Sequence, residues 1–478
     1  MKKLAPEFRN QLENLLGREE SQQLLEALQA EQPVSIRLNT KKPLPKEVDG
    51  EVVPWCEEGR YLAQRPSFTF DPLFHAGCYY VQEASSMFLS QAIRQYVQQP
   101  VWALDLCAAP GGKSTLLRSC LPEGSMLVCN EIMRGRAQVL AENMVKWGHP
   151  DVMVTNNASE DFTLCSNLFD VIVADVPCSG EGMFRKDDEA IACWSLENVR
   201  MCAERQQHLI YNSWPALKPG GLLIYSTCTY NAEEDERNVA WMMQEYGAEI
   251  LPVEVPSGVE VVGNLIGESF PVYHFMQHKV KGEGFFLAVL RKPMELGFKP
   301  FYLPDVSRLE KDKKKKNKVK LPLPVNDILQ TVRPWVNNPD DYHWVADENG
   351  VRALPLALAS FHAWGQKNGL KMMEAGIQVA TMKGKDLMPA HQLAMSLSLN
   401  REAFFNQELD YQQAIAYLRK DMIVLPHAPK GFVLVTYQGV PLGFVKNVGN
   451  RANNLYPQEW RIRSLLLNNH ANPPQSHP

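Results

Sequence analysis

The sequence of 478 residues is poor in several features that mark whole classes of protein. Its ten cysteines stand singly between Cys56 and Cys228, with no C-x-x-C pair and none beyond Cys228. This spacing argues against a zinc module and against a disulfide framework, so we expect reduced thiols and no metal site. No apolar run approaches the ~20 residues of a transmembrane helix, and the start lacks the apolar stretch of a secretory signal. We therefore expect a cytoplasmic protein without a membrane partner.

The chain also lacks a dominant charge. Lysine and arginine number 49 against 54 aspartate and glutamate, which gives a formal net charge of −5. This balance does not indicate a nucleic-acid-binding protein by itself, although acidic surface elsewhere can hide a local basic patch. The length exceeds that of one ordinary hydrophobic core, so we expect several domains, in a chain that acts as a monomer.

A loop of small residues follows an apolar stretch at residues 101–115, VWALDLCAAPGGKST. The pattern predicts a strand, a tight turn and a helix. Pro110 stiffens the turn and removes a backbone donor, while Gly111 and Gly112 let the main chain approach a ligand without a Cβ in the way. The free amides at the start of the helix favour an anionic or carboxylate group. The loop is therefore suited to a small polar cofactor.

Two familiar nucleotide-binding patterns are missing from this loop. The P-loop pattern G-x-x-x-x-G-K-[ST] requires glycine where this chain has Cys107, and the G-x-G-x-x-G pattern is broken at Ala109 and Pro110. Residues 112–114, Gly-Lys-Ser, nevertheless match the end of a P-loop. A nucleotide hydrolase therefore remains an alternative at this point.

Apolar stretches alternate with helical segments through the middle of the chain, which predicts a parallel sheet covered on both faces. The stretches are 102–106, 126–131, 152–157, 169–175 and 222–228. Ligands of such sheets bind at the carboxyl ends of the strands, which here carry Glu131, Asn157 and Asp175. Glu131 has the spacing of an acid that binds ribose hydroxyls. Asn157 is either an adenine contact or a turn residue. Asp175 suits either the site of an adenosine-bearing cofactor or the magnesium site of a hydrolase.

Two cysteines lie at the ends of the fourth and fifth of these strands. Cys178 and Cys228 can lie side by side over one pocket, and a thiol near a helix start or a cation becomes a thiolate nucleophile. A nucleotide hydrolase has no use for either. A thiolate that faces an adenosine cofactor suits pyrimidine methylation: addition to carbon 6 makes carbon 5 a nucleophile, and a base then removes the carbon 5 proton.

Four segments together resemble the motifs of the Nol1/Nop2/Sun (Fmu) family of RNA cytosine-C5 methyltransferases. They are DLCAAPGGKST, ADVPCSGEGMFRKD, YSTCTYNAEEDE and HKVKGEGFF, which fall within residues 80–292. The resemblance implies a Rossmann-like class I methyltransferase core with S-adenosylmethionine as cofactor. The residues it implies for cofactor binding are Cys107, Ala108, Ala109, Pro110, Gly111, Gly112, Lys113, Glu131, Asn157 and Asp175.

The same resemblance implies Cys228 as the nucleophile and Cys178 as the helper of product release. Asp175, as a catalytic residue, and Cys178 are the candidates for the acid and base of proton removal. Spacing alone does not choose between the cysteines, because DNA cytosine methyltransferases use the cysteine of the Pro-Cys pair. The family commonly has aspartate where this chain has Asn157. A factor that binds RNA but has lost catalysis is a further alternative.

The flanking regions predict additional domains. A helical pattern and two strand patterns predict a small α+β N-terminal domain at residues 1–75, followed by the catalytic domain at 76–292. A linker at 293–322 contains a lysine run at 311–320, either a solvated tail or a phosphate contact. An intermediate domain is expected at 323–400, and residues 401–478 resemble a PUA-like β-barrel module.

The resemblance of the length and the C-terminal extension implies ribosomal RNA, of the 16S type, or the small ribosomal subunit as partner. Candidate RNA contacts are Lys446, Asn450 and Arg451 on a loop of the last module, and Arg37 on an N-terminal strand. An exposed arginine on an edge strand is more often only solvated, so both readings of Arg37 stay open.

Overall fold

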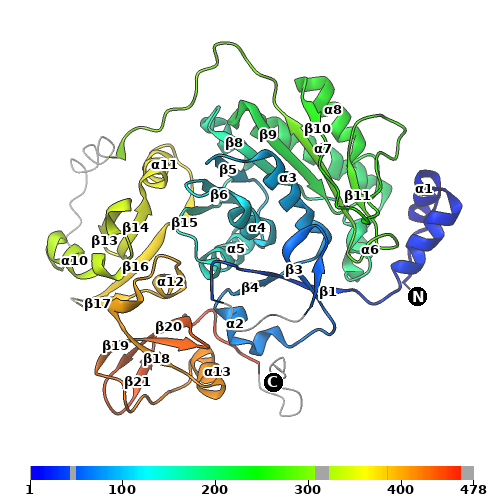
Figure 1. The fold of residues 1–478 in the computed structure, drawn as a ribbon. Helices are drawn as coiled ribbons and strands as arrows, with labels where there is room; N and C mark the ends of the chain where they lie inside the picture. The colour runs from blue at the N-terminus through cyan, green and yellow to red at the C-terminus, as the bar shows by residue number, and fades with distance from the viewer. Residues whose placement is uncertain (1, 44–49, 307–321, 385, 465–478) are drawn as a thin grey trace.

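The computed structural model describes residues 2–43, 50–306, 322–384 and 386–464 (Figure 1). The lysine run at 311–320 lies outside these ranges. A large central sheet carries an N-terminal sheet on one side and two further sheets built by the C-terminal half. None of the helices in the described ranges combines the length and the apolar sequence needed to cross a bilayer.

The N-terminal part is α+β, as the sequence predicts. The helical pattern at the start forms helix α1 (Pro6–Ala27), which bends at Gly17, whose φ of 79° lies in the left-handed region. Strands β1 (Val34–Leu38), β2 (Glu51–Val53), β3 (Cys56–Leu62) and β4 (Tyr79–Val81) form a sheet in the order β2-β3-β1-β4. Strand β1 is thus an interior strand of this sheet and not an edge strand.

The central sheet has the Rossmann-like order expected from the alternating pattern. Strands β7 (Val152–Thr155), β6 (Met126–Asn130), β5 (Trp102–Asp105), β8 (Phe169–Asp175) and β9 (Leu217–Thr227) run parallel in that spatial order. Beyond β9, strand β12 (Phe285–Arg291) is antiparallel and pairs with both β10 (Glu249–Leu251) and β11 (Tyr273–Phe275). The order reverses between β5 and β8, which places the ligand edge at the carboxyl ends of these two strands.

Helices cover both faces of the central sheet. Helices α3 (Leu89–Tyr96), α4 (Gly112–Cys120) and α5 (Arg134–Trp147) pack on one face. Helices α7 (Leu196–Ser213), α8 (Glu236–Tyr246) and α11 (Leu356–Lys367) pack on the other. Neighbouring residues of one strand, such as Leu127 and Val128, contribute to opposite clusters. This burial on both faces explains why the strands read as continuous apolar runs.

The segment expected as an intermediate domain is partly built into the central sheet. Strand β15 (Met372–Ala375) pairs antiparallel with β7 and so extends the sheet at its edge. The Phe361 ring of α11 lies 5.5 Å from the Trp102 ring of β5. The rest of the segment forms α10 (Val325–Val332), α12 (His391–Met395) and the sheet β13 (Tyr342–Asp347), β14 (Gly350–Pro355), β16 (Ile377–Lys383), β17 (Asp386–Pro389). The central sheet therefore includes a strand from beyond residue 292.

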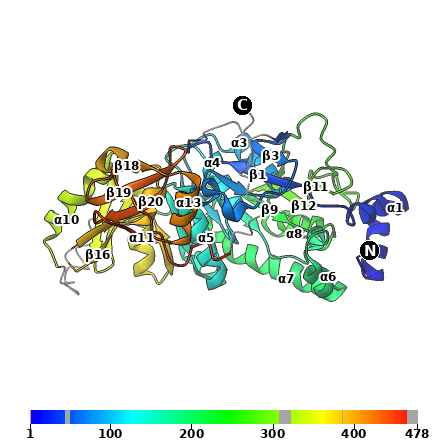
Figure 2. The same ribbon diagram turned by 90° about the horizontal axis from the view of Figure 1, so that it is seen from below.

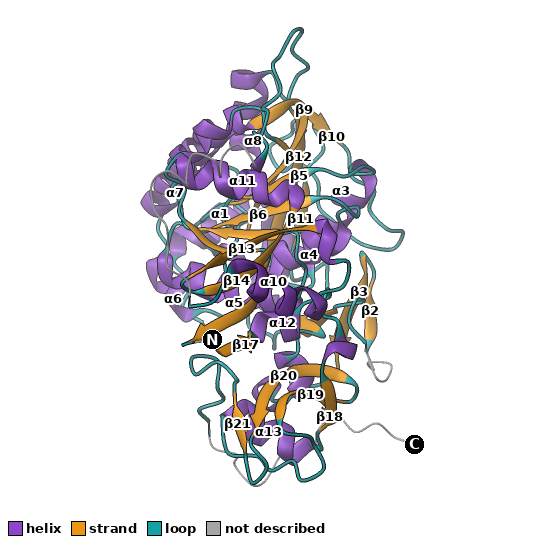
Figure 3. Cartoon of the chain, turned by 90° about the vertical axis from the view of Figure 1, so that its left-hand side faces the viewer, coloured by secondary structure: helices purple, strands orange, loops and turns teal. Residues whose placement is uncertain are grey.

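The C-terminal module forms a separate small sheet at the end of the molecule opposite α1 (Figure 2), and Figure 3 shows its strands β18–β21 below the central sheet. Strands β18 (Phe405–Glu408), β19 (Gly431–Tyr437), β20 (Val440–Asn447) and β21 (Ala452–Asn454) lie in this order, with α13 (Tyr411–Arg419) beside them. Among the described strands the path is open, without the barrel closure expected from the sequence. The module shares a hydrophobic cluster with Ile36 and Leu38 of the N-terminal sheet.

Candidate active site

The glycine-containing loop lies between β5 and α4, as predicted. The Ala108 amide donates to the Asn130 carbonyl at 2.8 Å, and the Asn143 side chain donates to the Pro110 carbonyl at 2.8 Å. Gly111 has a φ of 116°, a conformation that favours glycine, and it immediately precedes α4. These bonds fix the loop against β6 and α5, so its main chain forms a preorganised cradle.

Lys113 and Asp175 connect this loop to the end of β8. The Lys113 ammonium lies 2.8 Å from Oδ2 of Asp175, and the Ser226 hydroxyl donates to Oδ1 at 2.9 Å. Burial alone would lower the pKa of Lys113, but the Asp175 carboxylate outweighs it, so this pKa lies above the ordinary value. The lysine that could belong to a P-loop is therefore committed to a carboxylate.

Glu131 and Asp105 are two further acids at this edge. Glu131, directly after β6, is 3 % exposed, accepts from the Met133 amide at 2.9 Å and faces Arg136 at 3.4 Å. Asp105 ends β5 and is fully buried; Oδ2 accepts from Ser114 at 2.7 Å, whereas Oδ1 has no partner among the described residues. Burial raises the pKa of Asp105 to about 7. The sequence analysis did not single out Asp105, although an aspartate at the end of an apolar strand was the available signal.

Asn157 follows β7 as predicted, but its side chain has a partner that the sequence did not suggest. Its amide donates to the Lys371 carbonyl at 3.2 Å and accepts from the Lys371 main-chain N–H at 2.9 Å. An ionised carboxylate could accept the second of these bonds but could not donate the first. Asn157 therefore anchors the chain entering β15, which competes with the expected adenine contact.

Replacing Asn157 with aspartate should separate these two roles. An aspartate carboxylate cannot donate to the Lys371 carbonyl, so we expect a loss of about 1–2 kcal/mol in the free energy of unfolding. Denaturant unfolding measures this loss, and calorimetry measures cofactor affinity. Unchanged stability with clearly tighter cofactor binding would show that the side chain serves adenine and not β15.

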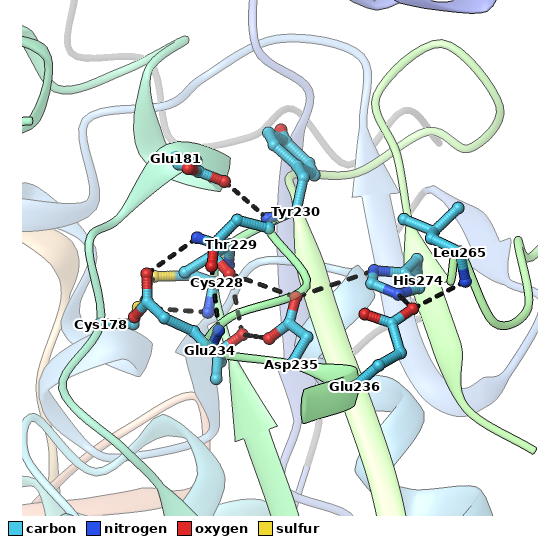
Figure 4. Close-up of polar contacts among 12 residues, drawn as sticks. Cys178, Glu181, Cys228, Thr229, Tyr230, Glu234, Asp235, Glu236, Leu265 and His274 are labelled. Carbon is cyan, nitrogen blue, oxygen red and sulfur yellow. Dashed lines mark hydrogen bonds and ion pairs between the residues drawn. The ribbon is translucent and has the colours of Figure 1, made fainter. Parts of the chain in front are cut away.

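The two predicted cysteines are brought together (Figure 4). The sulfur atoms of Cys178 and Cys228 are 2.9 Å apart, and the Cys228 amide donates to the Cys178 sulfur at 3.3 Å. The hydrogen bond to Cys228, together with burial, raises the pKa of the Cys178 thiol well above its ordinary value. Cys178 therefore keeps its proton at neutral pH, and the two sulfur atoms share a hydrogen bond in which either can be the donor.

Buried acids surround the two thiols, and the sequence analysis missed them as site residues. Glu181 lies after Cys178, and Glu234 and Asp235 lie after Cys228; all three side chains are fully buried. Asp235 accepts from Thr227 at 2.6 Å and from Thr229 at 3.2 Å, the two neighbours of Cys228. Burial raises the pKa of Glu234 to about 7. The acidic run after Cys228 was visible in the sequence, but it reads there as a helix cap.

The expectation that Arg37 contacts RNA is wrong. Arg37 is fully buried, because β1 is an interior strand. Its guanidinium donates to Gln82 at 2.8 Å and to Thr115 of α4 at 2.6 Å, and it lies 4.5 Å from the centre of the Trp147 ring. Arg37 therefore fastens the N-terminal sheet to the cofactor-loop helix.

Replacing Arg37 with alanine should destabilise the fold by about 3 kcal/mol, because it leaves a cavity and buried acceptors without donors. Thermal unfolding measures this effect. Arg65→Ala is the matched control, since Arg65 is exposed and lies over the Phe68 ring. Equal melting temperatures for the two variants, with RNA affinity lost only in Arg37→Ala, would contradict the buried role.

The other candidate RNA contacts lie on the C-terminal sheet. Asn450 and Arg451 are exposed in the loop between β20 and β21. Lys446 is partly exposed at the end of β20, where it pairs with Asp386 at 3.1 Å. These residues remain predictions, and the structure places them at the surface.

Family models match three parts of the chain. They are described as 16S rRNA methyltransferase RsmB/F at residues 95–291, the RsmF PUA domain at 404–462, and the N-terminal domain of 16S rRNA methyltransferase RsmF at 4–84. A curated relative from Klebsiella pneumoniae, ribosomal RNA small subunit methyltransferase F, is 32 % identical over 85 % of this chain and 84 % of its own length. The chain belongs to the RsmB/F methyltransferase family.

Other proteins resemble this RsmB/F protein in sequence or in fold. Ribosomal RNA small subunit methyltransferase F of Aliivibrio salmonicida is 29 % identical over 89 % of this chain and 90 % of its own length. A methyltransferase homologue from Pyrococcus horikoshii has a TM-score of 0.53 and 27 % identity, covering 60 % of this chain and 95 % of its own. NSun6 from the same organism, solved with SFG, shares the fold at a TM-score of 0.52 and 20 % identity, covering 62 % of this chain and all of its own. The cofactor of this family is S-adenosylmethionine.

Proposed function

We propose that this RsmB/F protein methylates carbon 5 of cytosine in 16S ribosomal RNA through a covalent bond between Cys228 and carbon 6. The observation that carries the proposal is the contact between two thiols, 2.9 Å apart, at adjacent strand ends beside the cofactor loop. A methyltransferase acting on oxygen or nitrogen needs no such pair. The relatives named as small-subunit ribosomal RNA methyltransferases supply the substrate class.

The residues at the strand ends fit S-adenosylmethionine. Gly111 and Gly112 in the cradle at residues 107–113 let its main chain approach a ligand without a Cβ in the way. Glu131 has the position of a ribose-binding acid, and the unpartnered Oδ1 of buried Asp105 is a free acceptor near the loop. When bound, the cofactor supplies an electrophilic methyl group.

Cys228 begins the reaction on the base. Its thiolate forms a bond to carbon 6, and the electron pair of the C5–C6 double bond then becomes available at carbon 5. Asp175 lies at the same edge of the sheet, held by Lys113 and Ser226, and a proton passed from its carboxyl group to N3 neutralises the charge that the addition places on the ring. These groups activate carbon 5 for methylation.

Cys178 acts when the product leaves. After the carbon 5 proton has been removed, its electron pair restores the double bond and expels Cys228 as a thiolate. The protonated Cys178 thiol, already in hydrogen-bond contact, stabilises that departing thiolate. The target cytosine has to be unpaired or flipped, since a thiol cannot reach carbon 6 within a stacked helix.

The test is bisulfite sequencing of 16S ribosomal RNA, as naked RNA and as small subunits, after incubation with the protein and S-adenosylmethionine. We expect new cytosines that resist deamination, together with 5-methylcytidine in a nucleoside digest. Transfer of a labelled methyl group to RNA without 5-methylcytidine would overturn the proposed position of methylation. No transfer to either substrate would overturn the proposed substrate.

A further inference from the structure

Two loops carry the cysteines, and each loop sends a carboxylate to the main chain of the other. Glu181, on the Cys178 loop, accepts from the Tyr230 amide at 2.9 Å. Glu234, on the Cys228 loop, accepts from the Ser179 amide at 3.0 Å through Oε2 and at 3.3 Å through Oε1. The amides concerned belong to residues one and two positions after the cysteines. The exchange is reciprocal, and Figure 4 shows its Glu181–Tyr230 half.

Both carboxylates accept further hydrogen bonds, most of them from residues outside the two loops. Glu181 also accepts from the Trp194 indole at 2.9 Å and from Gln11 of α1 at 2.8 Å. Glu234 also accepts from Gln206 of α7 at 2.7 Å and from Asn231 at 2.9 Å. Because both side chains are fully buried, these hydrogen bonds are not exchanged with water. Each carboxylate is therefore held in one position by hydrogen bonds to residues of the surrounding fold.

A third hydrogen bond joins the two loops at the main chain of Cys228 itself. The Gly182 amide, next to Glu181, donates to the Cys228 carbonyl at 2.8 Å. Gly182 is also packed against a third segment, since a Cβ there would lie 2.6 Å from the Gly284 carbonyl oxygen. The distance between the sulfur atoms thus depends on bonds that cross between the loops.

We propose that Glu181 and Glu234 are positioning residues that hold Cys178 and Cys228 in thiol contact. They form a reciprocal brace, defined as the two carboxylates and the Tyr230 and Ser179 amides. Neither touches the reacting base, and their effect on methylation, which rests on the proposed function, passes through the sulfur–sulfur contact. The brace itself is a property of the geometry and can be measured without any substrate.

Diamide oxidation of the full-length protein measures the thiol contact. Diamide takes two electrons and two protons from a thiol pair and leaves one S–S bond, and mass spectrometry of the joined peptides follows the Cys178–Cys228 product. In Glu181→Gln and Glu234→Gln the charge is lost and an NH₂ group faces existing donors. We expect the rate of this cross-link to fall roughly tenfold or more, the factor for one lost charge-assisted hydrogen bond.

Glu233→Gln is the matched control, because Glu233 precedes Glu234, is half exposed and pairs only with Arg237 among the described residues. We expect its cross-linking rate to equal that of the wild type. Melting curves confirm that each variant is folded at the assay temperature. Methylation by the two brace variants should lose kcat while KM for S-adenosylmethionine stays unchanged, because the brace does not touch the cofactor loop.

The possible outcomes separate the brace from the proposed reaction. Unchanged cross-linking in folded Glu181→Gln and Glu234→Gln would overturn the brace, whatever the methylation results. Equal slowing in Glu233→Gln would also overturn it, because the effect would then be one of general charge. Slower cross-linking in the brace variants alone, in a protein that methylates no cytosine, would leave the brace standing and reject the proposed function.

Discussion

Cys228→Ala is expected to abolish methyl transfer to RNA. Without addition of the thiolate to carbon 6, carbon 5 of cytosine is too weak a nucleophile to take the methyl group. The rate should therefore fall by roughly 10⁴-fold or more, the order seen when a covalent nucleophile is removed. Cys228 lies at the carboxyl end of β9, in contact with Cys178, and alanine removes only the sulfur. Transfer of a labelled methyl group from S-adenosylmethionine to 16S ribosomal RNA measures this loss.

The appropriate control is Cys193→Ala, since Cys193 is exposed on α6 (Asp188–Cys193), away from the thiol pair. We expect it to retain wild-type activity. Cofactor affinity should be unchanged in Cys228→Ala, because the loop at residues 107–113 is untouched. Methyl transfer by Cys228→Ala within tenfold of the wild type would rule out Cys228 as the nucleophile.

Cys178→Ala is expected to trap the enzyme on its substrate. The variant keeps Cys228 and can form the bond to carbon 6, but it lacks the thiol that stabilises the departing sulfur. We expect a covalent protein–RNA complex that survives denaturing electrophoresis, with turnover reduced by roughly 10²-fold or more, the order typical of losing a proton-handling group. The complex should require S-adenosylmethionine for its full yield.

The double variant Cys178→Ala, Cys228→Ala decides which sulfur is attached to RNA. It should form no complex, and Cys193→Ala should form none above the wild-type level. A stable complex in Cys228→Ala, and not in Cys178→Ala, would show that the roles of the two cysteines are reversed. This result is possible in chemical terms, because spacing in the sequence does not distinguish the cysteines.

Much of the central sheet could be predicted because local pattern determines it. Strands buried on both faces are continuous apolar runs, and polar residues at their ends mark the ligand edge, which located Glu131, Asp175, Cys178 and Cys228. The acids Glu181 and Glu234 were not predicted as site residues. Their role depends on contacts between two loops, which no single segment contains.

Other features depend on pairings between distant segments. The sequence around Met372 predicts a short strand but not its pairing with β7, more than two hundred positions earlier. Arg37 lies in an alternating strand pattern that is the same for an edge strand and an interior strand, so its burial could not be foreseen. In both cases long-range packing decides the environment, and periodicity describes only one strand at a time.

The addition of β15 and α11 to the central sheet has a consequence for folding while the protein is synthesised on the ribosome. Strand β7 is made early, yet its outer edge pairs with β15, and Trp102 meets Phe361 only after the intervening chain has emerged. The central sheet therefore completes late in translation, with an open strand edge during the interval. Chaperones that bind nascent chains can cover the unpaired edge of β7 during this interval. A chain released before Ala375 lacks the complete β15 strand that pairs with this edge.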